Sequence, residues 1–197
     1  MTQEALIKRC TWCGDAPDYQ HYHDHSWGRP VYDSKELFAK LCLDGQQAGL
    51  SWITILRKQQ NYYQAFAQFQ PDKIAQYQDQ DCARLMENKG IVRNKLKINS
   101  IIKNARAYLA IEAQGQTFSD YIWSFVNGKT IVNRYTHMQD IPAESPESQA
   151  MSKALKKAGF NFVGPTICYA FMQAVGMVND HLVDCHVYRE CVELAKR

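Results

Sequence analysis

Between two segments of helical spacing the chain reads Gly159-Phe160-Asn161-Phe162-Val163-Gly164-Pro165-Thr166. The segment before it, 152–158, is rich in lysine, and the segment after it, 167–175, is apolar. A glycine such as Gly159 suits the left-handed residue that ends a helix, and Gly164-Pro165 favours a tight turn. Thr166 is then placed to cap the second helix. The sequence therefore predicts a helix-hairpin-helix unit at about 152–175.

A helix-hairpin-helix of this kind can hold an anion. The hairpin and the new helix N-terminus, around Gly164 and Thr166, present backbone N–H groups, and such groups bind a phosphate without reading base sequence. The preceding helix adds positive charge at Lys153, Lys156 and Lys157. The pattern indicates a nucleic-acid backbone as partner, although an ordinary corner between two helices of a helical protein would look the same.

The composition is that of a globular chain with a modest positive charge. The 197 residues are 46% hydrophobic and 22% charged, and the net charge is +3. This charge permits nucleic-acid binding but requires any basic surface to be local. We expect no membrane association, because no stretch is long and apolar enough to span a bilayer and the start of the chain lacks the pattern of a signal peptide. The 7 cysteines are an odd, scattered set, which favours reduced thiols and a cytoplasmic location.

Apolar residues recur with helical spacing nearly throughout, so the predicted fold class is all-α. Residues 33–36 read Asp-Ser-Lys-Glu, which is typical of a capping box that opens an amphipathic helix. A long amphipathic helix is expected from 98 to about 115, and residues 133–149 are expected to form a polar surface loop. We interpret residues 1–197 as a single unit of two helical lobes.

A second basic segment, 90–97, reads Gly-Ile-Val-Arg-Asn-Lys-Leu-Lys and is followed by Lys103 and Arg106. It could extend a nucleic-acid surface. The solvent-facing side of the long helix would carry the same charges, and we favour this second interpretation.

Cysteine and histidine gather at both ends of the chain. The two groups are Cys10, Cys13, His21, His23 and His25, and His181, Cys185, His186 and Cys191. His181 and Cys185 are four residues apart, so one helical turn would put both on one face as half of a tetrahedral zinc site. Spacing leaves the N-terminal partners open, because Cys10 with Cys13 and Cys10 with His23 would each complete four ligands. Such a set is typical of structural zinc that ties two segments together, and the alternative is buried cysteines and surface histidines.

Aromatic residues crowd the N-terminal segment, and one more follows a glycine-containing stretch: Trp12, Tyr19, Tyr22, Trp27 and Trp52. With the carboxylate of Asp44 they suit a flipped nucleobase, because rings stack on its faces and a carboxylate reads its edge. A purine made cationic by alkylation would gain further from cation–π attraction. Any one tryptophan more often anchors a core. A carboxylate that follows an apolar helix face, as Asp44 does, is costly there unless it is paired.

Taken together, these segments resemble the DNA-3-methyladenine glycosylases of the constitutive, type I class, a family of the helix-hairpin-helix superfamily. The resemblance covers nearly the whole chain, from Arg9 to Cys185. Its motifs are Arg9-Cys10-x-Trp12, Tyr22-His23-Asp24-x-x-Trp27-Gly28, Gly45-Gln-Gln-Ala-Gly-Leu-Ser-Trp52, Trp123-Ser-Phe-Val-Asn127, Phe162-Val-Gly164-x-Thr166 and Val178-Asn-Asp-His181. Agreement over so many separated motifs is specific, and it implies a helix-hairpin-helix glycosylase fold.

The resemblance implies roles for individual residues. One structural zinc per chain would bind the positions that match the family's ligands: Cys10, His23, His181 and Cys185. This zinc clasp would join 10–23 to 181–185 and leave Cys13 as a bystander. The base-binding positions of the family fall on Trp12, Tyr22, Trp52 and the carboxylate at 44. The position that fills the gap left in the DNA stack falls on Gly49-Leu50.

Two carboxylates depart from the family pattern. The family usually has glutamate at position 44, and Asp44 is one methylene shorter, so contact with the base edge would need a backbone shift or a water. Asp184 lies in Leu182-Val-Asp-Cys-His-Val, which is similar to the stretch that carries a catalytic aspartate in other glycosylases of the superfamily. We assign the catalytic role to Asp44 and rank Asp184 second, because Asp184 adjoins the expected ligand Cys185.

The predicted function is that of a monofunctional DNA glycosylase that releases 3-methyladenine from alkylated double-stranded DNA and so starts base excision repair, acting as a monomer. Lyase chemistry is not expected, because it needs an amine at the sugar, and Lys156 and Lys157 lie on the helix before the hairpin. The main alternative is a non-catalytic, zinc-containing module that recognises distorted DNA. A zinc deaminase is disfavoured because four protein ligands leave zinc no water site.

Overall fold

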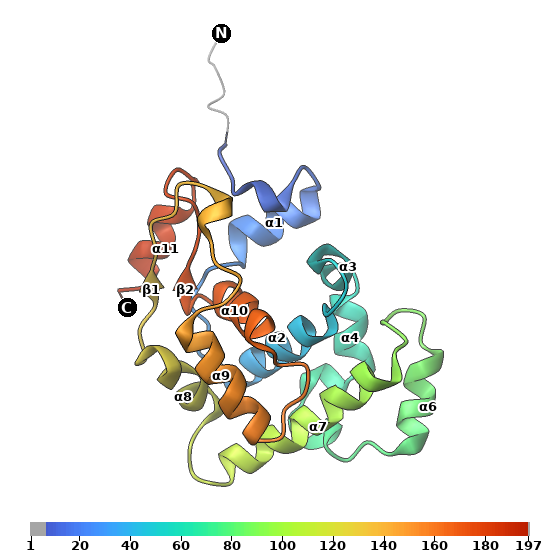
Figure 1. The fold of residues 1–197 in the computed structure, drawn as a ribbon. Coiled ribbons are helices and arrows are strands. Elements are labelled where there is room, and N and C mark those ends of the chain that lie inside the picture. Colours follow the sequence, from blue (N-terminus) through green and yellow to red (C-terminus); the bar gives the residue numbers. More distant parts are fainter. Residues whose placement is uncertain (1–6, 197) are drawn as a thin grey trace.

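The computed structural model describes residues 7–196, so residues 1–6, where the absence of a signal peptide was judged, and residue 197 lie outside the described chain. Within it the fold is all-α, as predicted, apart from two short strands (Figure 1). The α-helices are α1 Pro17–His25, α2 Ser34–Gln46, α3 Trp52–Leu56, α4 Gln59–Ala65, α5 Pro71–Ile74, α6 Asp79–Glu87, α7 Lys95–Glu112, α8 Phe118–Trp123, α9 Pro146–Lys157, α10 Pro165–Ala174 and α11 Tyr188–Leu194. The remaining elements are the 3-10 turns η1 Thr11–Cys13, η2 Ala67–Phe69, η3 Ser124–Val126 and η4 Met138–Asp140, and the strands β1 Ile131–Val132 and β2 Val178–Asn179. Among residues 7–196 no helix combines the length and the apolar character that crossing a bilayer requires.

Helix α2 occupies the centre of the molecule (Figure 1). Asp33 caps it, since its carboxylate accepts the backbone N–H groups of Lys35 and Glu36, both at 2.9 Å; this is the Asp33 half of the predicted capping box. The helix contacts α7, α8 and α10, and its apolar residues are buried against them. The last residues of α2, 44–46, are buried as well. This helix therefore carries a carboxylate, Asp44, into the interior.

Helix α7 packs along α2 and fixes the turn that follows it. Asn94 caps the first turn of α7, with its side chain accepting the Lys97 N–H at 3.1 Å. The ammonium of Lys97 is buried and donates to the carbonyl oxygens of Gln46 at 2.8 Å and Ala48 at 2.6 Å. The expectation of a solvated basic face is therefore wrong for Lys97, because this lysine satisfies carbonyl groups at the end of α2.

The helix-hairpin-helix is formed by α9 and α10. Helix α9 begins at Pro146 after the cap Ser145, so it takes in the end of the region predicted as a loop. It ends as predicted at Gly159, whose φ is +101°, and the Phe160 N–H donates to the Leu155 carbonyl at 3.0 Å. The hairpin is thus locked onto the last turn of α9.

The predicted cap of α10, Thr166, is wrong, because the N-cap is Gly164, two residues earlier. Pro165 occupies the first helical position, for which its fixed φ is suited, and this makes Gly164 the N-cap. Thr166 is consequently the second helical residue, and no side chain caps the helix. The Cys168 N–H donates to the Gly164 carbonyl at 2.8 Å, so the N–H groups of the first turn before it are free for an external acceptor.

The strands and two backbone contacts bring the chain ends beside α10. Strand β1 pairs in parallel with β2, with Ile131 opposite Val178; the sequence did not indicate these strands, which are only two residues long. The segment after α1 runs against the end of α10, where the Gly28 N–H donates to the Ala174 carbonyl at 3.2 Å and the Val31 N–H to the Val175 carbonyl at 3.1 Å. The N-terminal segment is thereby fixed next to the last turn of α10.

Replacing Gly176 by alanine should strongly destabilise this junction. Gly176 has φ +70°, and a Cβ atom there would lie 2.4 Å from the nitrogen of Pro30 and 2.5 Å from the carbonyl carbon of Arg29. Two backbone segments would have to separate, at a cost of about 1–3 kcal/mol beyond the strain of the positive φ itself. Thermal and urea unfolding followed by circular dichroism would measure this loss.

Gly128→Ala is the matched control. Gly128 has a similar φ of +72°, but no atom lies within 4 Å of a Cβ placed there. The difference in unfolding free energy between the two variants therefore reports the close backbone approach alone. Equal destabilisation by both substitutions would contradict the expectation.

Candidate metal site and aromatic pocket

Two cysteines and two histidines from opposite ends of the chain meet in one buried cluster: Cys10, His23, His181 and Cys185. Their ligand atoms all lie within 4.8 Å of one another. The Nδ1 atom of His181 is 3.7 Å from the sulfur of each cysteine, and the Nε2 atom of His23 is 3.6 Å from the sulfur of Cys185. Tetrahedral zinc with its usual sulfur and nitrogen bond lengths would set such atoms about 3.5 Å apart. The cluster could therefore hold a metal ion.

Hydrogen bonds orient both imidazoles toward the sulfur atoms. The Nδ1 atom of His23 is 2.8 Å from the carboxylate of Asp24, which in turn accepts a 2.7 Å bond from Arg9. The Nε2 atom of His181 is 3.1 Å from the carbonyl oxygen of Trp27. Each ring thus uses one nitrogen outside the cluster and presents the other to it. Outer partners of this kind fix the tautomer of a metal-binding histidine.

The C-terminal half of the cluster is not helical, so the predicted helical turn is wrong. Residues 181–187 form turns, and the Cys185 N–H donates to the Leu182 carbonyl at 2.8 Å. Strand β2 ends at Asn179, and the extended backbone leaving it does not turn into a helix until α11 begins at Tyr188. A turn brings His181 and Cys185 together in place of a helix face.

The structure also separates the two N-terminal ligand sets that spacing left open. Cys10 and His23 enter the cluster, whereas Cys13 is outside the group of four. The thiol of Cys13 donates to the Cys10 carbonyl at 3.2 Å and so stabilises the turn η1. This arrangement agrees with the set that the family resemblance implies.

The predicted aromatic residues surround a cavity of about 270 Å³. Its walls include Trp12, Tyr19, Tyr22, Trp27, Lys40, Asp44 and Trp52. The ring centroids of Tyr22 and Trp52 are 5.6 Å apart, and those of Trp12 and Trp27 are 5.0 Å apart. Trp27 also packs edge-on against His181, with centroids 4.6 Å apart, so the cavity and the metal cluster share a wall.

Three buried polar atoms in this cavity have no hydrogen-bond partner. They are Oδ2 of Asp44 and the indole nitrogens of Trp12 and Trp52. Asp44 is only 2% exposed. Its other carboxylate oxygen, Oδ1, forms an ion pair with the ammonium of Lys40, which lies one helical turn earlier. Buried polar groups are normally paired. One acceptor and two donors between aromatic walls therefore suit a flat ligand with polar edges.

Lys40 is a component of the pocket that the sequence analysis did not identify. Burial raises the pKa of Asp44, and the ammonium of Lys40 opposes that rise. Burial lowers the pKa of Lys40, and the carboxylate of Asp44 opposes that change in turn. One sequence feature could have identified Lys40. It lies four residues before Asp44 on one predicted helix, and this spacing places the two opposite charges side by side.

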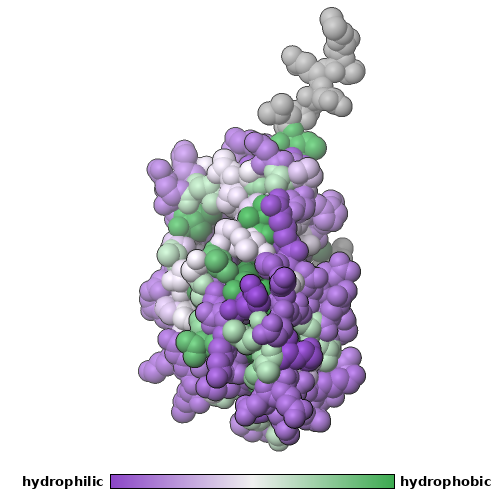
Figure 2. All heavy atoms as spheres, turned by 90° about the vertical axis from the view of Figure 1, so that its right-hand side faces the viewer, coloured by the Kyte–Doolittle hydropathy of each residue, from purple (hydrophilic) through white to green (hydrophobic). Residues whose placement is uncertain are grey.

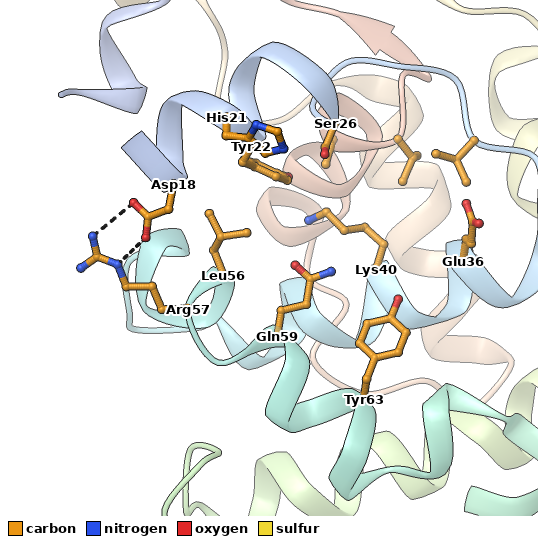
Figure 3. A pocket seen from close by; sticks show the side chains of 13 residues that line it. Asp18, His21, Tyr22, Ser26, Glu36, Lys40, Leu56, Arg57, Gln59 and Tyr63 are labelled. Atoms are coloured by element: carbon orange, nitrogen blue, oxygen red, sulfur yellow. Dashed lines mark hydrogen bonds and ion pairs between the residues drawn. The ribbon is translucent and has the colours of Figure 1, made fainter. Parts of the chain in front are cut away.

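An open groove of about 560 Å³ adjoins the aromatic cavity, and Tyr22 and Lys40 line both (Figure 3). On its far side Asp18 pairs with Arg57, with Nε and Oδ2 2.8 Å apart. Figure 2 shows the side of the molecule formed by α3, α4 and α6, where apolar residues gather in the upper and central part and hydrophilic residues cover the lower part.

The last turn of α2 lies against the hairpin. A Cβ atom on Gly45 would be 3.1 Å from Phe162 of the hairpin. From α7, the Asn104 side chain accepts the N–H of Asn161 at 2.8 Å and donates to its carbonyl at 3.2 Å. Leu50, in the turn 47–51, is 41% exposed. The structure therefore places an exposed apolar side chain and the hairpin on neighbouring elements.

The second-ranked carboxylate lies elsewhere. The side chain of Asp184 is 42% exposed, pairs with the ammonium of Lys8, and is not among the residues that line the aromatic cavity. Lys153, Lys156 and Lys157 are exposed on α9 before the hairpin.

Fold and site together define a DNA glycosylase of the helix-hairpin-helix type, in which a hairpin suited to the DNA backbone stands beside an aromatic pocket sized for an extruded base. The chain belongs to the methyladenine glycosylase family, which it matches over residues 12–189. It is 54% identical over 180 residues to the DNA-3-methyladenine glycosylase of Haemophilus influenzae, covering 91% of this chain and 97% of that protein. It is 53% identical over 182 residues to DNA-3-methyladenine glycosylase 1 of Escherichia coli, covering 92% and 97%.

Solved structures give the same result. A crystal structure of a 3-methyladenine DNA glycosylase I superposes with a TM-score of 0.90 at 52% identity and covers 91% of this chain and 98% of its own. The Staphylococcus aureus enzyme, described for its recognition of 3-methyladenine, superposes with a TM-score of 0.89 at 43% identity and covers 91% and 96%.

Proposed function

We propose that this protein is a monofunctional DNA glycosylase that hydrolyses the N-glycosidic bond of 3-methyladenine in alkylated duplex DNA, the first step of base excision repair. The observation that carries the proposal is the aromatic cavity with three unpartnered polar atoms, among them Oδ2 of Asp44. Relatives that cover nearly the whole chain have this activity in their names.

The chemistry of the substrate explains why such a pocket suffices. Methylation at N3 leaves a positive charge on adenine, so the base is already a good leaving group. The enzyme has to unstack, select and orient it, and a nearby anion stabilises the cationic sugar of the transition state. Trp12, Tyr22 and Trp52 would stack on the base, while Asp44 would accept from its exocyclic amine through Oδ2.

The contacts with DNA would come from the hairpin and from the turn after α2. Backbone N–H groups at the start of α10, beside Gly164 and Thr166, are free to bind a phosphate. Leu50 would fill the gap that the extruded base leaves. Gly49 has φ +76° with no atom within 4 Å of a Cβ position, so it allows a sharp turn with the DNA close by.

Lyase activity is not part of this proposal. The amine nearest the base would be Lys40, whose ammonium is paired with Asp44, and a protonated amine is not a nucleophile. The alternative, a non-catalytic module for distorted DNA, would bind methylated DNA without releasing a base. We further propose that the enzyme acts in the cytoplasm as a monomer; the 7 cysteines, none of them in a disulfide, support a reducing compartment.

We also propose that the buried Cys/His cluster binds one zinc ion per chain with a structural role. Four protein ligands close the coordination sphere, so the metal would hold the zinc clasp together and would take no part in the reaction.

Asp44→Asn should lower the release of free 3-methyladenine from methylated DNA by about 10²-fold, because the variant loses the anion that faces the sugar and the base. Asp184→Asn, at an exposed carboxylate outside the cavity, should release the base at the wild-type rate. Chromatography of released bases measures both. A larger loss in Asp184→Asn would move the catalytic role, and wild-type protein that binds methylated DNA without releasing a base would support the non-catalytic alternative.

Metal analysis of purified protein should give one zinc per chain. Cys185→Ser should lose the metal and melt at a lower temperature, because folding and binding are coupled at such sites. Cys13→Ser is the matched control, since Cys13 is also buried and lies next to the cluster without joining it; it should keep the metal. Folded wild-type protein without metal would refute the zinc site.

A further inference from the structure

Lys40 makes two contacts that both concern the proposed base pocket. Its ammonium pairs with Oδ1 of Asp44 and lies 3.7 Å from the centroid of the Trp52 ring. The lysine side chain is only 16% exposed. In Figure 3 it extends from α2 with its nitrogen directed toward Tyr22. The lysine thus separates the aromatic cavity from the open groove and lines both.

Helix stability does not account for this pair. An acidic residue four positions after a basic one is the weaker order for an ion pair on a helix. Asp44 also lies in the last turn of α2, which ends at Gln46, where the helix dipole disfavours a negative charge. A buried carboxylate in this position is costly unless a cation compensates it. The pair therefore serves the cavity and not the helix.

We propose that Lys40 is a positioning residue for Asp44: it keeps the buried carboxylate ionised and occupies Oδ1, so that Oδ2 remains directed to the edge of the base. The inference rests on the proposed function of the pocket. It also gives a physical role to the shorter side chain at position 44, because an aspartate one turn after Lys40 is fixed by a partner on its own helix.

No other described group can replace Lys40 in this role. The remaining titratable side chains that act on or are influenced by Asp44 are Tyr22 from α1, Cys42 from α2 and Cys168 from α10. Burial raises the pKa of all three, to about 12 for Cys168, so they are neutral at neutral pH. In the groove the other charged or titratable side chains beside Lys40 are Asp18, His21, Glu36, Arg57 and Tyr63. Of these, Arg57 is engaged with Asp18.

Removing the ammonium should change the pH dependence of the reaction. Burial alone would then act on Asp44, so its pKa would rise above the wild-type value and the carboxylate would be protonated up to a higher pH. Because base release uses the anion, activity would be lost at low pH and regained as the pH is raised.

The test compares Lys40→Met and Lys40→Arg with the wild type. Methionine keeps an unbranched apolar stem without the charge, and arginine keeps the charge. We expect the acid limb of kcat/KM for 3-methyladenine release in Lys40→Met to move up by about one pH unit or more, which is a tenfold loss along that limb. Lys40→Arg should keep the wild-type limb. In an Asp44→Asn background Lys40→Met should produce no shift.

An NMR titration of the Asp44 carboxyl carbon, without DNA, gives a second readout. Its midpoint should be higher in Lys40→Met than in the wild type, and circular dichroism and metal content should confirm that the variant is folded. An unchanged midpoint, or an activity loss that is uniform in pH, would overturn the positioning role. The two proposals can fail separately. If the wild type releases no 3-methyladenine, the proposed function is refuted. If the NMR midpoint of Asp44 is nevertheless higher in Lys40→Met than in the wild type, the effect of Lys40 on Asp44 still holds.

Discussion

The aromatic cavity exists only while the two ends of the chain are held together, and the other features of the site depend on this closure. Trp12, Tyr22 and Trp27 come from the N-terminal segment, whereas the opposite wall belongs to α10. The apolar cluster that joins the ends is small, with four buried residues at its centre, two of them the cysteines of the metal cluster. Hydrophobic burial alone is therefore weak here. Specific contacts therefore hold the ends together. They are the Cys/His cluster, the ion pair of Arg9 with Asp24 and the close backbone approach at Gly176.

Three buried aspartates show how the surroundings separate structural from functional carboxylates. Asp24 is engaged by Arg9, His23 and His186. Asp180 accepts from Asn133, Tyr169 and Gln173. Asp44 alone among them has a buried oxygen without a partner. An unsatisfied buried carboxylate oxygen costs free energy. A ligand that donates a hydrogen bond to Oδ2 of Asp44 would offset this cost. The first two carboxylates stabilise the chain ends, and the third faces the cavity.

Local signals in the sequence were sufficient for the all-α fold class and for much of the hairpin. Gly159 and Asp33 act as predicted because their roles depend on neighbours in sequence. Thr166 was misjudged because Pro165 competes for the start of the same helix, and the turn at His181 and Cys185 was misjudged because the strand before it, only two residues long, left no pattern. Spacing predicted the pair His181 and Cys185, whereas the choice of Cys10 with His23 at the N-terminal end required the family resemblance, because spacing allows Cys10 with Cys13 equally. The sequence analysis gave Lys40 no role and expected Lys97 on a solvated helix face, and only tertiary packing reveals that each one compensates buried oxygen atoms.

Helix α10 carries the hairpin at its first turn and lines the cavity with Ala170, Gln173 and Ala174 near its end. At about 1.5 Å per residue, these residues lie roughly 6–12 Å beyond Thr166 along the axis. Under the proposed assignment one continuous helix joins the phosphate contact at the hairpin to the wall of the base cavity, so the length of α10 fixes the spacing between the two contacts.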